Sequence, residues 1–545
     1  MGVSQVFGRI ARNSALRRVI LAYAGFTVAE YGVWIGMLVY AYDQGGATTA
    51  GLVAIAQLVP AAIVAPLVAP IADRRSPVLL LAGGYAVQAL GAVMTAIAIF
   101  TGSAPVWAYL GAVLASTAVS TTRPAQSALL PALTREPEEL TGANVVIGWM
   151  ESLGILLAGG VVGVLLTVSN IETVFAVCAA VLAVATLAVA RLPVPAHQSD
   201  TPAISVLGHL KAGLAETKRS PASRLLVALL VIEFIAGGAL DVLFVVLAVD
   251  ILQAGEAWTG YLNMAYGFGG LVLGALAAFF VGRRLGPVIL TTALMLGLAL
   301  GATAMTSDLV VAVVLLAVVG GSRALFEVAV RVLLQRAVPA DLVARIFGLA
   351  EGLSTAGLAV GALLAPILVA VGGGRLALLC AAVLLPLAVL ARAGLLWRLD
   401  QHARVPIVEI SLLRSLPLFR MLPSQSIEGL AAALERQTYQ AGEVIVREGD
   451  EGDLYYAIAD GHVQVQRNAR PLCDLGRGEG FGEIALLGAG LRTATATATA
   501  PTTVYALERD AFLTAVNGHV PTQRSVAAVV TELRTRDELR DGRPS

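Results

Sequence analysis

Long apolar stretches, most of them about twenty residues or more, follow one another along the first four hundred positions of the chain. A helix needs about 20 apolar residues to cross the hydrocarbon core of a bilayer. Each stretch therefore predicts a membrane-spanning helix. The pattern predicts twelve spans in two sets of six, at about 19–42, 50–72, 77–100, 104–130, 142–168, 171–192, 223–252, 257–281, 285–306, 308–334, 342–371 and 375–397.

After position 400 the period of the pattern changes. Short apolar runs separated by glycine predict strands joined by turns, at 444–446, 454–458 and 463–465. Helical patterns flank them, at 407–416 and 424–434 before the strands and at 508–517 and 521–540 after them. The predicted domains are an N-terminal six-span half (1–193), a cytoplasmic interdomain linker (194–222), a C-terminal six-span half (223–400) and a separate C-terminal domain (401–545).

Composition supports a membrane protein. The 545-residue chain is 57% hydrophobic and 14% charged, with a mean hydropathy of +0.80, whereas soluble domains are about 45–50% apolar and about 25% charged. The net charge is zero, so we expect no nucleic-acid partner. Cys178, Cys380 and Cys473 are far apart, which predicts neither a disulfide framework nor a metal site. The chain has no Walker loop, so ATP-driven transport is not expected.

Basic residues in the loops predict the orientation, because cytoplasmic loops carry an excess of lysine and arginine. On one side of the predicted spans lie Arg74, Arg75, Arg135, Lys211, Lys218, Arg219, Arg283, Arg284, Arg336, Arg398 and Arg404. The opposite side carries Asp43, Glu172, Glu256, Asp308 and one clear base, Arg375. We therefore expect an integral plasma-membrane protein with both termini and the linker in the cytoplasm.

The two sets of six spans repeat each other. Charged residues recur at offsets of 200, 200 and 203 positions, in the pairs Arg123 and Arg323, Glu151 and Glu351, and Glu30 and Glu233. Two parallel six-span repeats are the architecture of transporters whose halves are related by an axis along the membrane normal.

With these repeats in view, the first 400 residues resemble the major facilitator superfamily. The runs RPAQ at 123–126, LLP at 129–131 and AN at 143–144 resemble its drug- and siderophore-efflux branch. The loop IADRR at 71–75 resembles the loop motif of the family, although Ala69 stands where a glycine is usual. The resemblance implies a secondary transporter, and the efflux branch implies export of a small molecule.

Ionisable residues inside the spans are the candidates for transport chemistry, because each costs about 2.5–3.5 kcal/mol on insertion scales unless it faces a cavity or a partner. The candidates for proton coupling or for the substrate cavity are Glu30, Trp34, Arg123, Glu233, Asp241 and Arg323. We favour Glu30 and Glu233 as proton carriers, since carboxylates outnumber arginines here. The alternative is that these charges form ion pairs between helices, which we favour for Glu151 and Glu351.

A cytoplasmic gate is also expected. Glu151 and Glu351 lie near the predicted cytoplasmic ends of their spans, and in this family such acids often pair with loop arginines. The predicted gate residues are Asp73, Arg74, Arg75, Glu151, Glu351, Arg283 and Arg284.

The C-terminal domain contains a candidate anion site at 481–495, FGEIALLGAGLRTAT, where Arg492 follows Glu483 by nine residues. A helical turn that begins after a glycine presents backbone N–H groups to an anion. An arginine binds phosphate through charge-assisted hydrogen bonds, and a carboxylate can accept one from a sugar hydroxyl. These residue types at this spacing favour a sugar phosphate ligand.

This stretch resembles the phosphate-binding cassette of cyclic-nucleotide-binding domains, and the segment AGEVIVREGDEGDLYYAIADGHVQV before it resembles their β-roll. The resemblance covers about 405–540. It implies a binding set of Gly482, Glu483, Ile484, Ala485, Arg492 and Thr493. In that set Glu483 contacts the ribose 2′-hydroxyl, Arg492 contacts the cyclic phosphate, and Thr493 lies near the phosphate and base. Thr493 suits cAMP and cGMP; we favour cAMP because the composition looks bacterial.

The sequence thus predicts a mainly α membrane protein of twelve-span major facilitator fold with a C-terminal β-roll, and not an enzyme. Its function would be proton-coupled export of an unidentified small molecule, regulated by cyclic nucleotide and without a cofactor. Its partners would be the lipid bilayer, the nucleotide and the substrate. Two alternatives stay open: a non-transporting membrane receptor, and a transporter whose β-roll is a degenerate docking or oligomerisation module.

Overall fold

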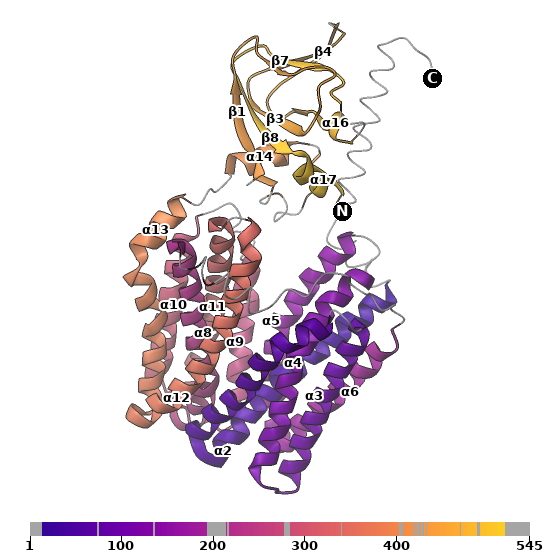
Figure 1. Ribbon diagram of the computed structural model, residues 1–545. Helices are drawn as coiled ribbons and strands as arrows, with labels where there is room; N and C mark the ends of the chain where they lie inside the picture. The colour runs from indigo at the N-terminus through magenta and orange to yellow at the C-terminus, as the bar shows by residue number, and fades with distance from the viewer. Residues whose placement is uncertain are drawn as a thin grey trace.

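The computed structural model describes residues 13–72, 76–133, 137–192, 214, 217, 219–276, 284–338, 340–402, 407–416, 418–419, 422, 427, 430–431, 433–468, 470–487 and 491–517. A helical part holds most of the chain, and a β-rich domain lies beyond one end of it (Figure 1). We call the end of the helical part away from the β-rich domain the distal end. The predicted helix at 521–540 and part of the one at 424–434 lie outside the described residues.

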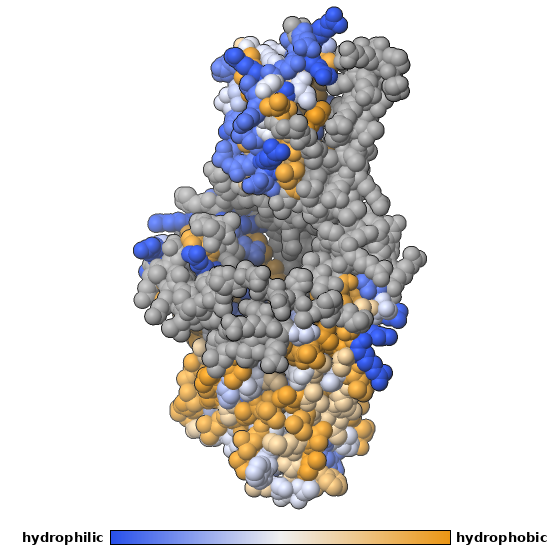
Figure 2. Space-filling model, turned by 45° about the vertical axis from the view of Figure 1, so that its right-hand side comes forward, coloured by the Kyte–Doolittle hydropathy of each residue, from blue (hydrophilic) through white to orange (hydrophobic). Residues whose placement is uncertain are grey.

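Apolar helices form both halves of the helical part. The N-terminal half contains α2 (Ser14–Ala72), α3 (Pro77–Phe100), α4 (Pro105–Leu133), α5 (Pro137–Val168) and α6 (Ile171–Ala190). The C-terminal half contains α8 (Pro221–Val246), the π-helical turn η1 (Leu247–Ile251), α9 (Ala257–Ala275), α10 (Gly286–Met305), α11 (Leu309–Ala337) and α12 (Ala340–Ala391). Apolar residues predominate on the lower part of the helical bundle in Figure 2, whereas hydrophilic residues cover much of the described surface of the β-rich domain.

Two of the helices, α2 and α12, each consist of two helical segments joined at a kink. At 1.5 Å per residue the 59 residues of α2 would extend about 88 Å as one straight helix, far beyond a hydrocarbon core of about 30 Å. Gly45–Gly46 interrupts α2, and Gly372–Gly373 interrupts α12. Gly46 and Gly373 have φ of +65° and +76°, a region that glycine enters without a Cβ clash. Each glycine pair therefore separates two of the predicted spans.

By length and composition, seven helical stretches in the described part of the chain are long and apolar enough to cross a membrane. In this count α2 and α12 each contribute one stretch, although a glycine pair divides each of them.

The backbones of the two halves come into close contact at glycine residues, which have no side chain. A Cβ added to Gly260 on α9 would lie 2.3 Å from the backbone nitrogen of Gly163 and 2.6 Å from the carbonyl oxygen of Gly159, both on α5. A Cβ added to Gly51 on α2 would lie 2.6 Å from the carbonyl oxygen of Ala362 on α12. Only glycine permits such close packing of helices.

These contacts lie toward the distal end. Gly51 follows the Gly45–Gly46 turn of α2, which Figure 1 places at the end opposite the β-rich domain. Gly163 is near the last residue of α5, and Gly260 is near the first residue of α9. The halves are thus held together at the distal end.

The β-rich domain consists of two antiparallel four-stranded sheets, with strand orders β1-β8-β3-β6 and β2-β7-β4-β5. Its strands are β1 (Glu435–Tyr439), β2 (Val444–Val446), β3 (Leu454–Asp460), β4 (Val463–Arg467), β5 (Arg470–Leu475), β6 (Gly480–Phe481), β7 (Thr495–Ala498) and β8 (Thr502–Glu508). Its helices are α14 (Ile407–Ser415), α16 (Glu483–Leu487) and α17 (Arg509–Asn517). The predicted strands correspond to β2, β3 and β4. The apolar pattern missed β1 and β5, because both are edge strands with largely exposed side chains.

Aromatic side chains join the helices of this domain to its first sheet. The ring of Tyr455 on β3 lies 5.5 Å from that of Phe419 and 5.1 Å from that of Phe512 on α17. The rings of Phe419 and Phe512 are fully buried. Since Phe419 follows α14, this cluster fixes the entry of the chain into the domain against β3.

We predict that Gly260→Val opens the distal end, because the added side chain would overlap the backbone of α5. Pulsed electron paramagnetic resonance between nitroxide labels at Asn170→Cys and Glu256→Cys, in a background without native cysteines, should show longer distances than without the valine. Gly352→Val is the matched control, since a Cβ at Gly352 meets nothing within 4 Å. An unchanged distance distribution in Gly260→Val would contradict the prediction.

Candidate functional site

The predicted cassette forms a compact turn between β6 and α16. Gly482 links the two elements with φ of +96°, and Glu483 is the first residue of α16. A Cβ at Gly482 would lie 2.6 Å from Nη1 of Arg492 and 3.0 Å from the carbonyl oxygen of Leu454. Glycine at 482 therefore provides both the backbone conformation and the space that brings Arg492 to this turn.

Arg492 is only 5% exposed. Its Nη2 donates to the carbonyl oxygen of Leu454 at 2.8 Å, and its Nη1 donates to that of Gly482 at 3.3 Å. The guanidinium also lies 5.6 Å from the ring centroid of Tyr456. Burial lowers the pKa of Arg492. An arginine has five N–H donors, so donors remain for a phosphate after the two carbonyl contacts.

Glu483 supplies a buried acceptor beside this cation. It is 7% exposed, and its Oε2 has no hydrogen-bond partner among the described residues. Desolvation raises the pKa of its carboxyl, although a backbone hydrogen bond and the nearby Arg492 act in the opposite direction. A buried polar atom without a partner is costly. A hydroxyl donor on a ligand would satisfy it.

The other predicted cassette residues surround this pair. Ala485 is buried, Ile484 is partly buried, and Thr493 is exposed. Sequence reasoning missed Gly452, where a Cβ would lie 2.5 Å from that of Ala485 and 3.1 Å from Nε of Arg492. The signal was available, because a glycine just before a strand often marks a close approach.

In the N-terminal half, the predicted cavity and gate residues come together. Arg123 on α4 donates from Nη2 to both carboxylate oxygens of Glu30 on α2, each at 3.2 Å, and from Nη1 to Glu151 on α5 at 3.0 Å. The hydroxyl of Tyr23 donates to Glu151 at 2.7 Å. Glu151 thus contacts an arginine within the helices, whereas the gate hypothesis paired it with loop arginines.

The C-terminal half carries a corresponding ion pair. Arg323 on α11 donates from Nε to Glu233 on α8, and its guanidinium lies 5.4 Å from the ring centroid of Phe234. Glu233 is buried, and its second carboxylate oxygen has no hydrogen-bond partner among the described residues. The residues that the sequence repeat related, Arg123 with Glu30 and Arg323 with Glu233, therefore make equivalent contacts.

The remaining predicted gate residues do not come together with Glu151 at one described site. Glu351 on α12 accepts from Arg331 on α11 at 3.3 Å, and Arg331 also contacts Glu327 at 3.0 Å. Arg331 was not among the predicted site residues. Arg284 is exposed just before α10. Asp73, Arg74, Arg75 and Arg283 lie outside the described residues.

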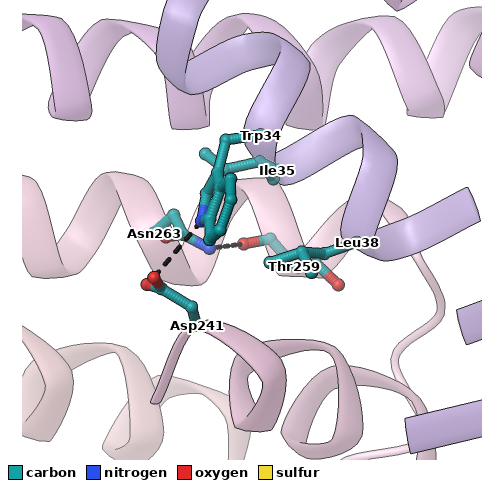
Figure 3. Close-up of a pocket in the computed structure, with 6 residues that line it drawn as sticks. All are labelled: Trp34, Ile35, Leu38, Asp241, Thr259 and Asn263. Atoms are coloured by element: carbon teal, nitrogen blue, oxygen red, sulfur yellow. Dashed lines mark hydrogen bonds between the residues drawn. The ribbon is translucent and has the colours of Figure 1, made fainter. Parts of the chain in front are cut away.

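Trp34 and Asp241 meet across the two halves. The indole Nε1 of Trp34 on α2 donates to Oδ2 of Asp241 on α8 at 3.2 Å. A small pocket surrounds this bond, as Figure 3 shows, and it is lined by Trp34, Ile35, Leu38, Asp241, Thr259 and Asn263. The pocket places two predicted cavity residues at one site, with one contributed by each half.

An apolar helical bundle in two halves, followed by a β-roll with a buried phosphate cradle, is the arrangement of a membrane transporter with a nucleotide-binding domain. The chain belongs to the Major Facilitator Superfamily, which matches residues 19–350, and it carries a Cyclic nucleotide-binding domain at residues 436–519. Both family resemblances are thereby confirmed.

The C-terminal domain is similar to parts of two protein kinase components and of a catabolite activator protein. Residues of this chain are 36% identical over 129 residues to the cAMP-dependent protein kinase regulatory subunit of Eremothecium gossypii, covering 24% of this chain and 26% of that protein. They are 33% identical over 142 residues to cGMP-dependent protein kinase, isozyme 1, of Drosophila melanogaster. This match covers 23% of this chain and 18% of that protein. The crystal structure of the Catabolite Activator Protein of Thermus thermophilus matches with 33% identity and a TM-score of 0.21. This match covers 23% of this chain and 62% of that one. The chain spans about a quarter or less of the two kinase relatives.

We predict that Glu483→Gln raises the thermal stability of the nucleotide-free protein at neutral pH. Burial raises the folded-state pKa of Glu483, so its protonated form is favoured in the fold, and stability falls as pH rises through that pKa. Glutamine removes this penalty. Thermal unfolding from pH 5 to 8 should show a smaller decline for Glu483→Gln than for the wild type.

The same substitution should weaken cyclic-nucleotide binding, because the charge-assisted hydrogen bond to the ribose is lost. Glu479→Gln, an exposed carboxylate that precedes β6, is the matched control. If Glu483→Gln lowered stability and left affinity unchanged, the assignment of Glu483 to the ligand would be wrong.

Proposed function

We propose that this protein is a proton-coupled secondary transporter that exports a small molecule, and that cytoplasmic cyclic nucleotide regulates it. The observation that carries the proposal is the cradle of Gly482, Glu483 and Arg492, in the same chain as a major facilitator bundle. In this cradle the buried Oε2 of Glu483 has no hydrogen-bond partner among the described residues. We further propose twelve spans, two each in α2 and α12 and one in each of eight other helices, with both termini and the 194–222 linker in the cytoplasm.

The packing of the halves supports an alternating-access cycle. Backbone contacts at Gly51, Gly159 and Gly260 close the distal end, which in the proposed orientation faces the outside. The cytoplasmic end is then the end through which substrate enters. Export requires these glycine contacts to separate and the cytoplasmic ends of the halves to meet.

The ligand of the C-terminal domain follows from the cradle. Arg492 can bind the cyclic phosphate, and Glu483 can accept from the ribose 2′-hydroxyl, with the backbone amides of Ile484 and Ala485 completing the site. We propose cAMP in preference to cGMP. The kinase relatives include one named for each nucleotide, and the exposed Thr493 leaves room for contact with the base of either.

A short helix supports mechanical coupling between the domains. α13 (Ala393–His402) follows α12 and leads toward the β-rich domain. Asp400 on α13 is 3% exposed, and its Oδ1 accepts from the backbone N–H of Leu285 at 2.8 Å, at the start of α10. A displacement of α14 on nucleotide binding would therefore reach α10 through α13.

The required energy of coupling is modest. A ligand changes the balance of two conformations only by its differential affinity for them, about tenfold for each 1.4 kcal/mol. One phosphate contact that forms in only one conformation of the domain is sufficient for a change of this size.

We propose that Glu30 and Glu233 carry the coupled protons. Each carboxylate is held by an arginine of its own half, Arg123 or Arg323. Protonation would neutralise the acid and release the arginine, which then needs another partner. In the N-terminal half Glu151 already shares Arg123, so proton binding at Glu30 would shift that arginine toward Glu151.

We predict that Arg492→Ala in the full-length protein weakens cAMP binding roughly ten- to hundredfold, because a charge-assisted hydrogen bond contributes about 1.5–3 kcal/mol. Isothermal titration with cAMP and cGMP measures the effect and ranks the two nucleotides. In proteoliposomes, solute flux should depend on cAMP for the wild type and lose that dependence in Arg492→Ala. Arg436→Ala, on an exposed strand outside the cradle, is the control.

Each outcome of these measurements selects one function. Flux that is absent under every gradient would exclude the transporter and favour a membrane receptor. Flux that is the same with and without nucleotide would exclude regulation. An absence of binding by either nucleotide would favour a degenerate docking module.

We predict that Glu30→Gln and Glu233→Gln abolish proton-driven flux, because an amide cannot carry the proton, while exchange of substrate across the membrane without a proton gradient continues. Substrate-driven proton movement, followed with a pH-sensitive dye inside proteoliposomes, is the measurement. Glu327→Gln is the control, as Glu327 contacts Arg331 one helical turn away. Full proton movement in both variants would contradict the assignment.

A further inference from the structure

A small cavity lies beside Glu30, and every residue that lines it belongs to the N-terminal half. Its volume is about 20 Å³. Glu30 on α2, Gln88 on α3 and Ser116 on α4 form its polar wall, and apolar side chains of α2, α4 and α6 form the rest. A cavity of about 10–15 Å³ or more can hold one water molecule where two to four polar groups surround it. This cavity meets both conditions.

Gln88 and Ser116 can offer the cavity only hydrogen-bond acceptors. Gln88 uses both hydrogens of its amide, since Nε2 donates to the carbonyl oxygen of Gly84 at 3.2 Å and to Oγ1 of Thr122 at 2.8 Å. Ser116 uses its hydroxyl hydrogen on Oε1 of Gln57 at 2.9 Å. What remains is an amide oxygen and the lone pairs of a hydroxyl, which accept hydrogen bonds and do not donate them.

The partners of these two side chains fix their orientation. Thr122 and Gln57 are fully buried. Thr122 donates in turn to the carbonyl oxygen of Ala118 at 3.1 Å, and Gln57 donates to that of Val53 at 3.5 Å. A hydrogen of Gln88 or Ser116 could reach the cavity only if a buried hydrogen bond were broken, and a buried group left without its partner is costly.

Glu30 needs such acceptors when it takes up a proton. In the ionised state both of its carboxylate oxygens accept from Arg123 at 3.2 Å. A protonated carboxyl has an O–H donor, and a guanidinium cannot accept from it. The Glu30 side chain is 19% exposed, so a proton can reach it from the side away from the cavity.

We propose that the cavity holds one water molecule and that this water accepts the hydrogen bond of the protonated Glu30 carboxyl. The water then donates one hydrogen to Oε1 of Gln88 and the other to Oγ of Ser116. With ionised Glu30, three acceptors would share the two hydrogens of the water. The cavity therefore favours the protonated form, and Gln88 and Ser116 are positioning residues for the proton. This inference rests on the proposed proton coupling at Glu30 and deepens it.

The ion pairs of the N-terminal half complete the exchange. When a proton neutralises Glu30, Arg123 keeps its contact with Glu151 at 3.0 Å, and the new hydrogen on Glu30 goes to the water. Both groups of the broken pair thus retain a partner. A metal cation in the cavity is disfavoured, because the positive charge of Arg123 already lies on the same carboxylate.

Other titratable groups also interact with Glu30. Besides Arg123 and Glu151 they are three tyrosines, Tyr23 and Tyr31 on α2 and Tyr85 on α3. Tyrosine and arginine ordinarily titrate at about pH 10 and above about pH 12, which leaves two carboxyls for an experiment to separate. Tyr85 is fully buried one turn from Gln88, and its hydroxyl has no hydrogen-bond partner among the described residues.

The test observes the carboxyl itself, by infrared difference spectroscopy of the full-length protein in bilayers at a series of pH values. A protonated carboxyl has a carbonyl-stretching band that an ionised one lacks, so no transported solute is needed. We expect this band in the wild type. It should be absent from Glu30→Gln and retained in Glu151→Gln.

Three variants change the cavity: Ser116→Ala, Gln88→Met and Val119→Ile, which adds a methyl group to the cavity wall and takes the space of the water. In each the band should move to higher frequency, because the carboxyl loses a hydrogen bond. The pH at which the band is half-maximal should fall by roughly half to one unit, the effect of one hydrogen bond.

Ser120→Ala is the matched control. Ser120 lies on the same helix one turn after Ser116, and its hydroxyl donates to the backbone carbonyl of Ala61 at 3.0 Å. This variant should keep the wild-type band and midpoint. An unchanged band in Ser116→Ala and Gln88→Met, or a midpoint that rises, would overturn the proposal. A change in those two variants but not in Val119→Ile would overturn the water.

Failure of this inference is separable from failure of proton coupling. If Glu30→Gln abolished proton-driven flux while the cavity variants left the Glu30 band unchanged, the cavity would have no part in a coupling that stands. If the cavity variants shifted the band while Glu30→Gln kept full proton movement, the cavity would stand and the coupling role of Glu30 would be overturned.

Discussion

The cost of placing charge in hydrocarbon organises the helical part of this protein. Arg123 and Arg323 each bind a glutamate on the first helix of their own half, Glu30 or Glu233. Removal of one partner would leave the other charge less compensated, most of all at Glu233, whose side chain is 1% exposed. Each pair joins two helices of the same half.

Contacts between the halves are of a different kind. Among the described residues they include backbone contacts permitted by glycine at Gly51, Gly159 and Gly260. They also include a hydrogen bond from the Tyr42 hydroxyl to Asp250 and one from the neutral indole of Trp34 to Asp241. Such contacts can separate without exposing a buried ion pair. At the other end Asp400 attaches α13, which leads toward the β-rich domain, to α10 of the C-terminal half.

Much of this arrangement was predictable from local patterns. Apolar runs located the helices, because a span needs about 20 apolar residues whatever its neighbours are. The repeat identified equivalent charges, and the spacing of Glu483 and Arg492 identified the cradle. Edge strands β1 and β5 were missed because exposed strands lack an apolar alternation. Arg331, Thr259 and Gly452 were missed because their roles depend on residues distant in the chain.

The sequence by itself determined the family, the two-domain composition and the residue types of both candidate sites, since these follow from hydrophobicity, spacing and motif. Only the tertiary structure decided which charges meet. It placed Glu151 on Arg123 and Glu351 on Arg331, and it left Asp241 with a neutral donor. Pairing in a helical bundle depends on the rotation and depth of each helix against its neighbours, and no local pattern records these quantities.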